Sequence, residues 1–157
     1  MKKITSISSI ADNYDYFLFD QWGVLHNGLN VFEDAKKCLI KLKQKGKKII
    51  LISNSSKLTK YTKLNLKKLG IDDNLYDHSI TSGQIAFDSF QNEIFNQYGE
   101  KCFPMSLSLE KIKMFKLKTV KSIKNANFVL IADIKPNSNL FDFTEDLKIM
   151  MDLNIPL

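Results

Sequence analysis

Short apolar runs alternate along the chain with segments whose apolar positions recur every three or four residues. Residues 16–19 and 49–52 are apolar throughout, as expected for strands buried in a parallel sheet. Between them, residues 32–45 show the helical spacing, followed by Gly46, which is placed to end a helix. A strand, a helix and a second strand in this order predict a right-handed crossover and a parallel sheet.

The alternation continues to the end of the chain. Ser53 to Ser56 are predicted to open a helix that reaches Leu69, because serine is a favoured N-cap. Further strands are predicted at 79–81, 101–104 and 128–132, and further helices at 84–98, 109–117 and 139–153. The predicted fold class is α/β, with a Rossmann-like parallel sheet. The apolar ending at 154–157 is typical of the approach to another strand, so we expect the chain to be incomplete.

Composition narrows the choice of partners. The net charge is +6, and all 23 basic residues are lysines. Proteins that read DNA bases rely on arginine, so we expect no nucleic-acid partner. The lysines between residues 36 and 68 are interpreted as a solvated helical surface, and a polyanion-binding basic domain is the weakest hypothesis. No apolar run approaches the ~20 residues of a membrane helix, so we expect a cytoplasmic protein without a membrane partner. The oligomeric state stays open.

Polar residues follow two strands of the predicted crossover. Asp20 follows the first strand, and Ser53 and Asn54 follow the second. Ligands of open parallel sheets bind beyond the carboxyl ends of the strands, and helix N-termini bind anions. A phosphate held by Ser53 and nearby backbone N–H groups could therefore be attacked by Asp20 through an aspartyl-phosphate. Mg²⁺ would bring the two anions together. Taken separately, these residues are also what an ordinary turn and an ordinary helix cap would contain.

Residues 19–28, with the sequence FDQWGVLHNG, resemble the first motif of the haloacid dehalogenase (HAD) superfamily. More narrowly, they are similar to the subfamily IIA-like branch with an α/β cap, in which a run Asp-x-Trp-Gly-Val-Leu/Ile-His-Asp-Gly occurs. Residues 52–55 are similar to the second motif. Residues 80–83 resemble the segment that leads into the cap, and 126–130 a later cap strand. The resemblance implies residues 1–82 as the N-terminal part of a HAD-like core and 83–157 as an incomplete, inserted α/β cap.

The resemblance also implies roles for single residues. Asp20 would be the nucleophile and a Mg²⁺ ligand, and the backbone carbonyl of Trp22 a second ligand. Ser53 and Asn54 would bind the phosphoryl group. The implied substrate is a small phosphorylated molecule.

Two departures from the family pattern bear on activity. The pattern places an Asp, as general acid and base, where this chain has Trp22, and a missing general acid typically costs ~10²–10⁴-fold in rate. His26 is the candidate substitute. The third and fourth motifs of the family follow the cap, so we expect a chain truncated within the cap to be poorly stable and inactive.

Two principal hypotheses follow. The first is a Mg²⁺-dependent phosphomonoester phosphatase that acts through an aspartyl-phosphate, with this chain as an inactive fragment. The second is a HAD-fold protein that binds a phosphate ligand without turnover, because Trp22 replaces the general acid. Nothing in the sequence identifies the substrate.

Overall fold

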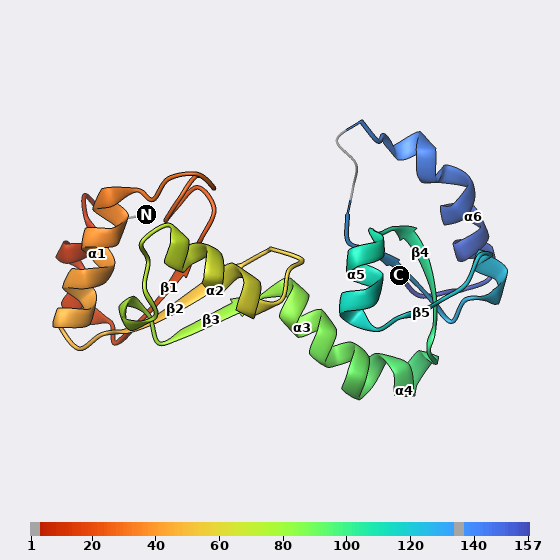
Figure 1. Cartoon of the computed structure of the whole chain (residues 1–157), viewed down its shortest axis with the longest axis horizontal. Coiled ribbons are helices and arrows are strands. Elements are labelled where there is room, and N and C mark those ends of the chain that lie inside the picture. The colour runs from red at the N-terminus through yellow and green to blue at the C-terminus, as the bar shows by residue number, and fades with distance from the viewer. Residues whose placement is uncertain (1–3, 134–136) are drawn as a thin grey trace. The chain divides into compact units, whose positions relative to one another are not determined.

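The structure, a computed structural model, describes residues 4–133 and 137–157. The chain divides into two compact units, Met1–Ile85 and Ala86–Leu157, and helix α3 (Ser82–Ser89) leads from the first into the second (Figure 1). Each unit has its own three-stranded parallel sheet and its own hydrophobic core. The α/β class with parallel sheets is therefore confirmed.

The first unit holds a sheet in the order β1-β2-β3, with every neighbour parallel. Its elements in chain order are β1 (Tyr16–Asp20), α1 (Glu33–Gln44), β2 (Lys48–Ser53), α2 (Thr59–Lys68) and β3 (His78–Thr81), with short 3-10 turns at Ile7–Ser9, Ala11–Asn13 and Asp73–Leu75. These elements follow the predicted alternation. Several boundaries differ by one residue, and one differs by more, because α2 begins at Thr59 and not at the serines after β2.

Both helices of the first unit cover the same face of its sheet. Leu39 and Leu42 of α1 and Leu66 of α2 lie in one core cluster with Ile49 and Leu51 of the central strand. Right-handed crossovers that advance in one direction across a sheet place their helices on one side, which explains this arrangement.

The opposite face of this sheet is open. Leu18 is 62% exposed, and Tyr16, Ile52 and Ile80 are exposed as well. The expectation that residues 16–19 are buried throughout is therefore wrong for Tyr16 and Leu18. An all-apolar strand predicts two covered faces, and the elements described in this unit cover one.

Asp77 fixes the start of β3 against β2. Its Oδ2 accepts hydrogen bonds from the backbone N–H of Ile49 (2.8 Å) and from Lys43 Nζ (2.9 Å), and Lys48 Nζ lies 3.3 Å from Oδ1. The pKa of Asp77 lies well below its usual range. The hydrogen bond from the Ile49 N–H is the largest cause, and the hydrogen bond from Lys43 is the second. One carboxylate thus joins the end of α1, β2 and β3.

The second unit holds a parallel sheet in the order β5-β4-β6. Its elements are the rest of α3, a π-helical turn (Phe90–Ile94), α4 (Phe95–Tyr98), β4 (Lys101–Ser106), α5 (Leu109–Phe115), β5 (Lys118–Thr119), a 3-10 turn (Ile123–Asn125), β6 (Phe128–Ile131), a 3-10 turn (Leu140–Phe143) and α6 (Thr144–Asp152). The backbone N–H of Val129 donates to the carbonyl of Pro156 (2.8 Å), so the last residues lie beside β6. The two-residue strand β5 was not predicted.

Aromatic rings fill the core of the second unit. Phe90 is buried and contacts three other rings, those of Phe95, Phe115 and Phe128, with centroids 5.6–5.9 Å away. The stack of Phe90 on Phe95 pairs residues five apart, which the π turn aligns because its hydrogen bonds run from residue i to i+5. Phe87, Phe90 and Phe95 therefore all contribute to the core of the second unit.

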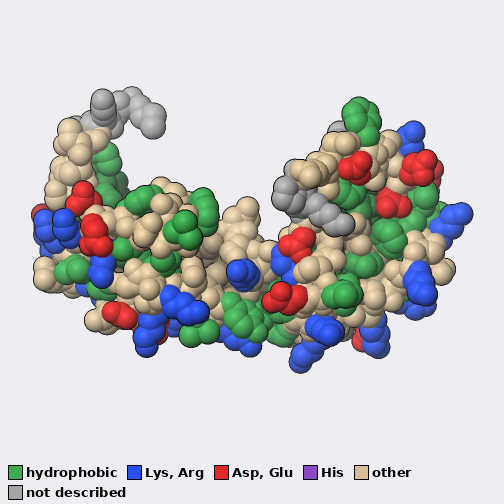
Figure 2. Space-filling model, turned by 45° about the horizontal axis from the view of Figure 1, so that its top comes forward, with side chains coloured by type: hydrophobic (Ala, Val, Ile, Leu, Met, Phe, Trp, Pro, Cys, Tyr) green, Lys and Arg blue, Asp and Glu red, His purple; other side chains and the backbone are tan. Residues whose placement is uncertain are grey.

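Lysines are spread over the surface. The face drawn in Figure 2 carries them at separate places and not as one continuous patch, which favours the interpretation as a solvated surface. Within the described part of the chain, no helix has both the length and the apolar character needed to cross a membrane.

Candidate functional site

The carboxyl ends of β1 and β2 carry the polar residues that the sequence singled out. Asp20 is the last residue of β1 and pairs with Ile52, and Ser53, the last residue of β2, pairs with Thr81 of β3. Parallel strands end at the same edge of a sheet, so Asp20 and Ser53 lie on adjacent strands at that edge.

A cavity of about 770 Å³ opens at this edge, entirely within the first unit. All five predicted site residues line it: Asp20, Trp22, His26, Ser53 and Asn54. The remaining lining residues are Gln21, Gly28, Ser55, Lys57, Tyr61, Thr62, Leu64, Asn65 and Lys68. The structure thus brings together residues from two loops and from the body of α2, a helix of which only the start was expected to contribute to the site.

The loop after β1 folds back around the carbonyl oxygen of Gln21. This oxygen accepts hydrogen bonds from the backbone N–H groups of Leu25 (2.9 Å) and His26 (3.3 Å), and Gly23 N donates to the His26 carbonyl (2.8 Å). The Gln21 side chain is buried, and its Nε2 donates to Ser79 Oγ (3.4 Å). Gln21 therefore anchors the loop, a role that no local sequence pattern indicated.

Trp22 takes the position where the family pattern has the general acid. Its side chain is 67% exposed, its indole ring meets the His26 ring edge-on at 5.9 Å, and it lies against the backbone of Gly28. None of the backbone hydrogen bonds in the described part of the chain ends on the Trp22 carbonyl oxygen. The indole packs over the loop, and the carbonyl accepts no backbone hydrogen bond from the described residues.

His26 is held as a neutral ring. Its side chain is buried, and Nδ1 accepts a hydrogen bond from the backbone N–H of Gly28 (3.0 Å). Nδ1 therefore carries no proton, and Nε2 carries the one proton of the neutral ring. Burial lowers the pKa of His26, and the nearby Asp20 carboxylate opposes this more weakly. His26 is thus arranged to donate a hydrogen bond through Nε2–H, which works against transfer of a proton from the imidazolium form.

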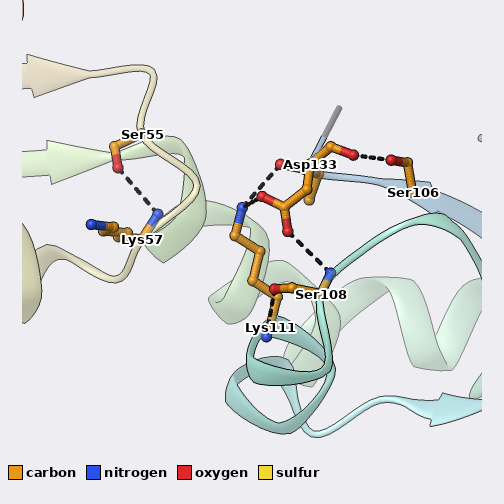
Figure 3. Close-up of polar contacts among 7 residues, drawn as sticks. Ser55, Lys57, Ser106, Ser108, Lys111 and Asp133 are labelled. Carbon is orange, nitrogen blue, oxygen red and sulfur yellow. Dashed lines mark hydrogen bonds and ion pairs between the residues drawn. The ribbon is translucent and has the colours of Figure 1, made fainter. Parts of the chain in front are cut away.

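Ser53 and Asn54 lie in a turn and not in a helix cap. Ser53 Oγ accepts from the backbone N–H of Ser55 (3.2 Å), and Ser55 Oγ accepts from that of Lys57 (3.2 Å, Figure 3). Successive turns of this kind compete with helix formation, which is why α2 starts only at Thr59. The expectation that a helix begins at these serines is wrong, so any anion held here would meet loop N–H groups.

The residues that join β3 to α3 pack against this turn and hold it in place. Thr81 is fully buried; its Oγ1 donates to the Lys57 carbonyl (2.8 Å) and accepts from Gln84 N (3.1 Å). A Cβ at Gly83 would come 2.2 Å from the Ser56 carbonyl oxygen, so only glycine lets α3 approach this closely. The role of this segment is not evident from local sequence patterns, because its partners lie more than twenty residues away.

In the second unit, the carboxylate of Asp133 contacts residues of the same unit. Asp133, which follows β6, pairs with Lys111 Nζ and accepts from the backbone N–H of Ser108 (3.1 Å, Figure 3). Across the described residues of the chain, no group of three or more His, Cys, Asp or Glu side chains is placed to hold a metal ion.

Comparisons with known proteins agree with the motifs. Residues 17–108 match the family described as haloacid dehalogenase-like hydrolase. No curated protein matches the sequence.

Solved structures with a similar fold include three hydrolases. A haloacid dehalogenase-like hydrolase from Brucella suis 1330 has a TM-score of 0.78 at 25% identity, over 96% of this chain and 57% of its own. A 4-nitrophenylphosphatase from Thermotoga maritima has a TM-score of 0.61 at 18% identity, over 94% and 55%. A glycerol phosphate phosphatase from Mycobacterium tuberculosis, solved with magnesium, has a TM-score of 0.56 at 17% identity, over 90% and 43%.

The chain spans about half the length of these structures. The family match covers more than half of the chain, and the resemblance seen in the sequence motifs is confirmed at this level. The chain belongs to the haloacid dehalogenase-like hydrolase family.

Proposed function

We propose that the protein containing this chain is a Mg²⁺-dependent phosphomonoester hydrolase with Asp20 as its nucleophile. The observation that carries the proposal is the shared cavity, in which Asp20 of one strand end lies with Ser53 and Asn54 of the next. The names of similar structures, a 4-nitrophenylphosphatase and a glycerol phosphate phosphatase, support the same reaction class.

The proposed reaction has two displacements at phosphorus. An Asp20 carboxylate oxygen forms a bond to phosphorus, and the bond from phosphorus to the ester oxygen breaks. The leaving oxygen takes a proton from solvent water and departs as the alcohol. A water molecule then attacks the aspartyl-phosphate at phosphorus, which frees orthophosphate and restores the carboxylate. Ser53, Asn54 and Nε2–H of His26 would donate hydrogen bonds to the phosphoryl oxygens.

The donor set at this edge fits Mg²⁺. Mg²⁺ prefers oxygen ligands and is commonly held by one or two carboxylates together with substrate phosphate. Asp20 supplies a carboxylate, and the Trp22 carbonyl has no hydrogen-bond donor among the described backbone groups. When bound there, the ion would supply positive charge that lets two anions approach.

The second candidate function is phosphate binding without turnover. Trp22 cannot transfer a proton as an Asp would, and His26 is neutral with Nδ1 engaged. Asp20 is also the only carboxylate among the described residues that line the cavity. These observations favour a binder, or an enzyme restricted to esters whose leaving group needs no proton.

We assign residues 1–82 to a HAD-like core and 83–157 to an α/β cap. The partner would be a small phosphorylated molecule, and the location cytoplasmic.

The test is phosphate release from 4-nitrophenyl phosphate with and without Mg²⁺. The assay uses the full-length protein, that is, the product of the whole natural reading frame. We expect release that requires Mg²⁺ and is lost in Asp20→Asn. The matched control is Asp34→Asn, which removes an exposed carboxylate that pairs with Lys37 on α1 and should leave the rate unchanged.

The outcomes separate the two functions. Release that survives Asp20→Asn would overturn the assignment of the nucleophile. No release from a folded protein that binds orthophosphate would favour the binding function.

A further inference from the structure

The cavity is larger than a phosphate group requires. Pockets of roughly 300–1,000 Å³ hold small organic ligands, and this one measures about 770 Å³. Asp20, Ser53 and Asn54 line its phosphate end. The lining also includes Tyr61, Thr62, Leu64, Asn65 and Lys68 of α2, and this helix leads away from Asn54 along the chain.

These α2 residues form one stripe of the helix. Tyr61, Leu64 and Lys68 are three or four residues apart and therefore share a face. All three are exposed, whereas Leu66 is turned toward the core. From Tyr61 to Lys68 the helix rises by about 10 Å, so its lining residues extend over about this distance along the cavity.

Two lysines that line the cavity lack an ion pair with any described residue. Lys57 and Lys68 line the cavity, and neither forms an ion pair within the described part of the chain. Lys63, on another side of the helix, is by contrast neutralised by Asp73 (3.3 Å). Lys60 Nζ adds a further positive charge 4.9 Å from the centre of the Tyr61 ring.

We propose that this part of the cavity, the α2 subsite (Tyr61, Leu64, Asn65 and Lys68), binds a second anionic group of the substrate. The substrate would be a phosphomonoester whose apolar middle lies against Tyr61 and Leu64 and whose distal anion pairs with Lys68. The inference rests on the proposed function, because the phosphate end orients the ligand. An apolar surface followed by the Lys68 ammonium group, which has no ion pair among the described residues, favours a ligand of this chemistry.

The test compares two non-hydrolysable ligands that differ only in charge at the far end. These are 4-carboxybenzylphosphonate and its neutral amide, 4-carbamoylbenzylphosphonate. Their dissociation constants are measured by calorimetry with the full-length protein and Mg²⁺. We expect the carboxylate to bind about fivefold more tightly, the gain of an ion pair worth ~1 kcal/mol.

Two variants assign the preference to one lysine. In Lys68→Gln the carboxylate and the amide should bind equally. Lys67→Gln is the matched control, because Lys67 is the neighbouring exposed lysine of α2 and does not line the cavity. It should keep the fivefold preference.

The possible failures are distinguishable. Equal binding of both ligands to the unaltered protein, or a preference that survives Lys68→Gln, would overturn the α2 subsite and leave the phosphate end intact. A folded protein that binds neither phosphonate nor orthophosphate would overturn the proposed function together with it.

Discussion

Gly28 lies directly against the indole ring of Trp22. A Cβ at Gly28 would come 2.3 Å from Trp22 Cζ3, and the backbone φ of Gly28 is +93°, a conformation that L-residues rarely adopt. Two independent requirements, one of space and one of backbone conformation, therefore act on the same glycine. Since the N–H of Gly28 also fixes the His26 ring, this contact shapes one wall of the cavity.

We expect Gly28→Ala to lower the free energy of unfolding by more than about 2 kcal/mol, because clash and backbone strain add. With Trp22→Ala already present, only the strain remains, and the cost should fall to ~1 kcal/mol. Denaturant unfolding of the four proteins in the double-mutant cycle measures both values. If Gly28→Ala lowers the free energy of unfolding equally with and without Trp22→Ala, the indole ring moves aside without an energetic cost.

The neutral, buried His26 predicts sensitivity to acid. Its pKa in the folded protein lies below the ordinary value of about 6.5, so the unfolded chain binds a proton first as the pH falls. The contribution of His26 is complete above pH ~6.5 and is lost as the pH falls from there toward the folded pKa.

Unfolding should therefore be compared at pH 7.5 and pH 5.5. His26→Gln should flatten the fall in stability between these values. His78→Gln, which removes the other, exposed histidine, should retain the fall. If the stability of His26→Gln falls between these pH values as steeply as that of the unaltered protein, the His26 ring is not held neutral in the folded protein.

Trp22 in place of a general acid predicts a strong dependence on the leaving group. An ester that releases nitrophenolate needs no proton, whereas an alkyl ester does. We expect kcat/KM for 4-nitrophenyl phosphate to exceed that for a simple alkyl phosphate by about 10²–10⁴. Trp22→Asp should narrow this ratio by raising the rate on the alkyl ester. Equal rates on both esters in the unaltered protein would reveal a proton donor elsewhere.

Asp77 predicts a stability that depends on one carboxylate. Asp77→Asn weakens bonds to the Ile49 N–H and to Lys43, and hydrogen bonds to charged groups are worth about 1.5–3 kcal/mol. Because the folded pKa lies below the unfolded value of about 3.9, this contribution is present above that pH and is lost as the pH falls.

The control for Asp77→Asn is Asp34→Asn, which breaks an exposed pair with Lys37 and should cost less than about 0.5 kcal/mol. Thermal or denaturant unfolding at pH 7 separates the two variants. Equal costs would show that the bonds of Asp77 contribute no more than a surface pair.

Local patterns predicted the parts of the fold that depend on neighbouring residues. The apolar run before Asp20 located β1, and the same reasoning located β2 before Ser53, so the two ends of the site were predicted. The start of α2 was not, because side chains of Ser53 and Ser55 bond to the backbone two residues on. These hydrogen bonds form turns at serine residues, which in other contexts cap helices.

The parts that depend on distant residues escaped sequence analysis. Gln21 is positioned by Ser79, and Thr81 by Lys57, and nothing near either residue in the sequence reports the partner. The far wall of the cavity escaped for another reason. Exposed lysines on an amphipathic helix are typical of a solvated surface, and only the concave shape beside α2 distinguishes Lys68 from Lys67.

The π turn at Phe90–Ile94 has a consequence for insertions and deletions. A π turn amounts to one extra residue in an α-helix, so the helical phase before it and the phase after it differ by about 100°. Removing one residue from this turn would restore a regular helix and rotate Phe95 away from Phe90, while the start of α3 stays fixed by Gly83. A homologue that lacks this residue would need a differently spaced aromatic residue to fill the same place in the core.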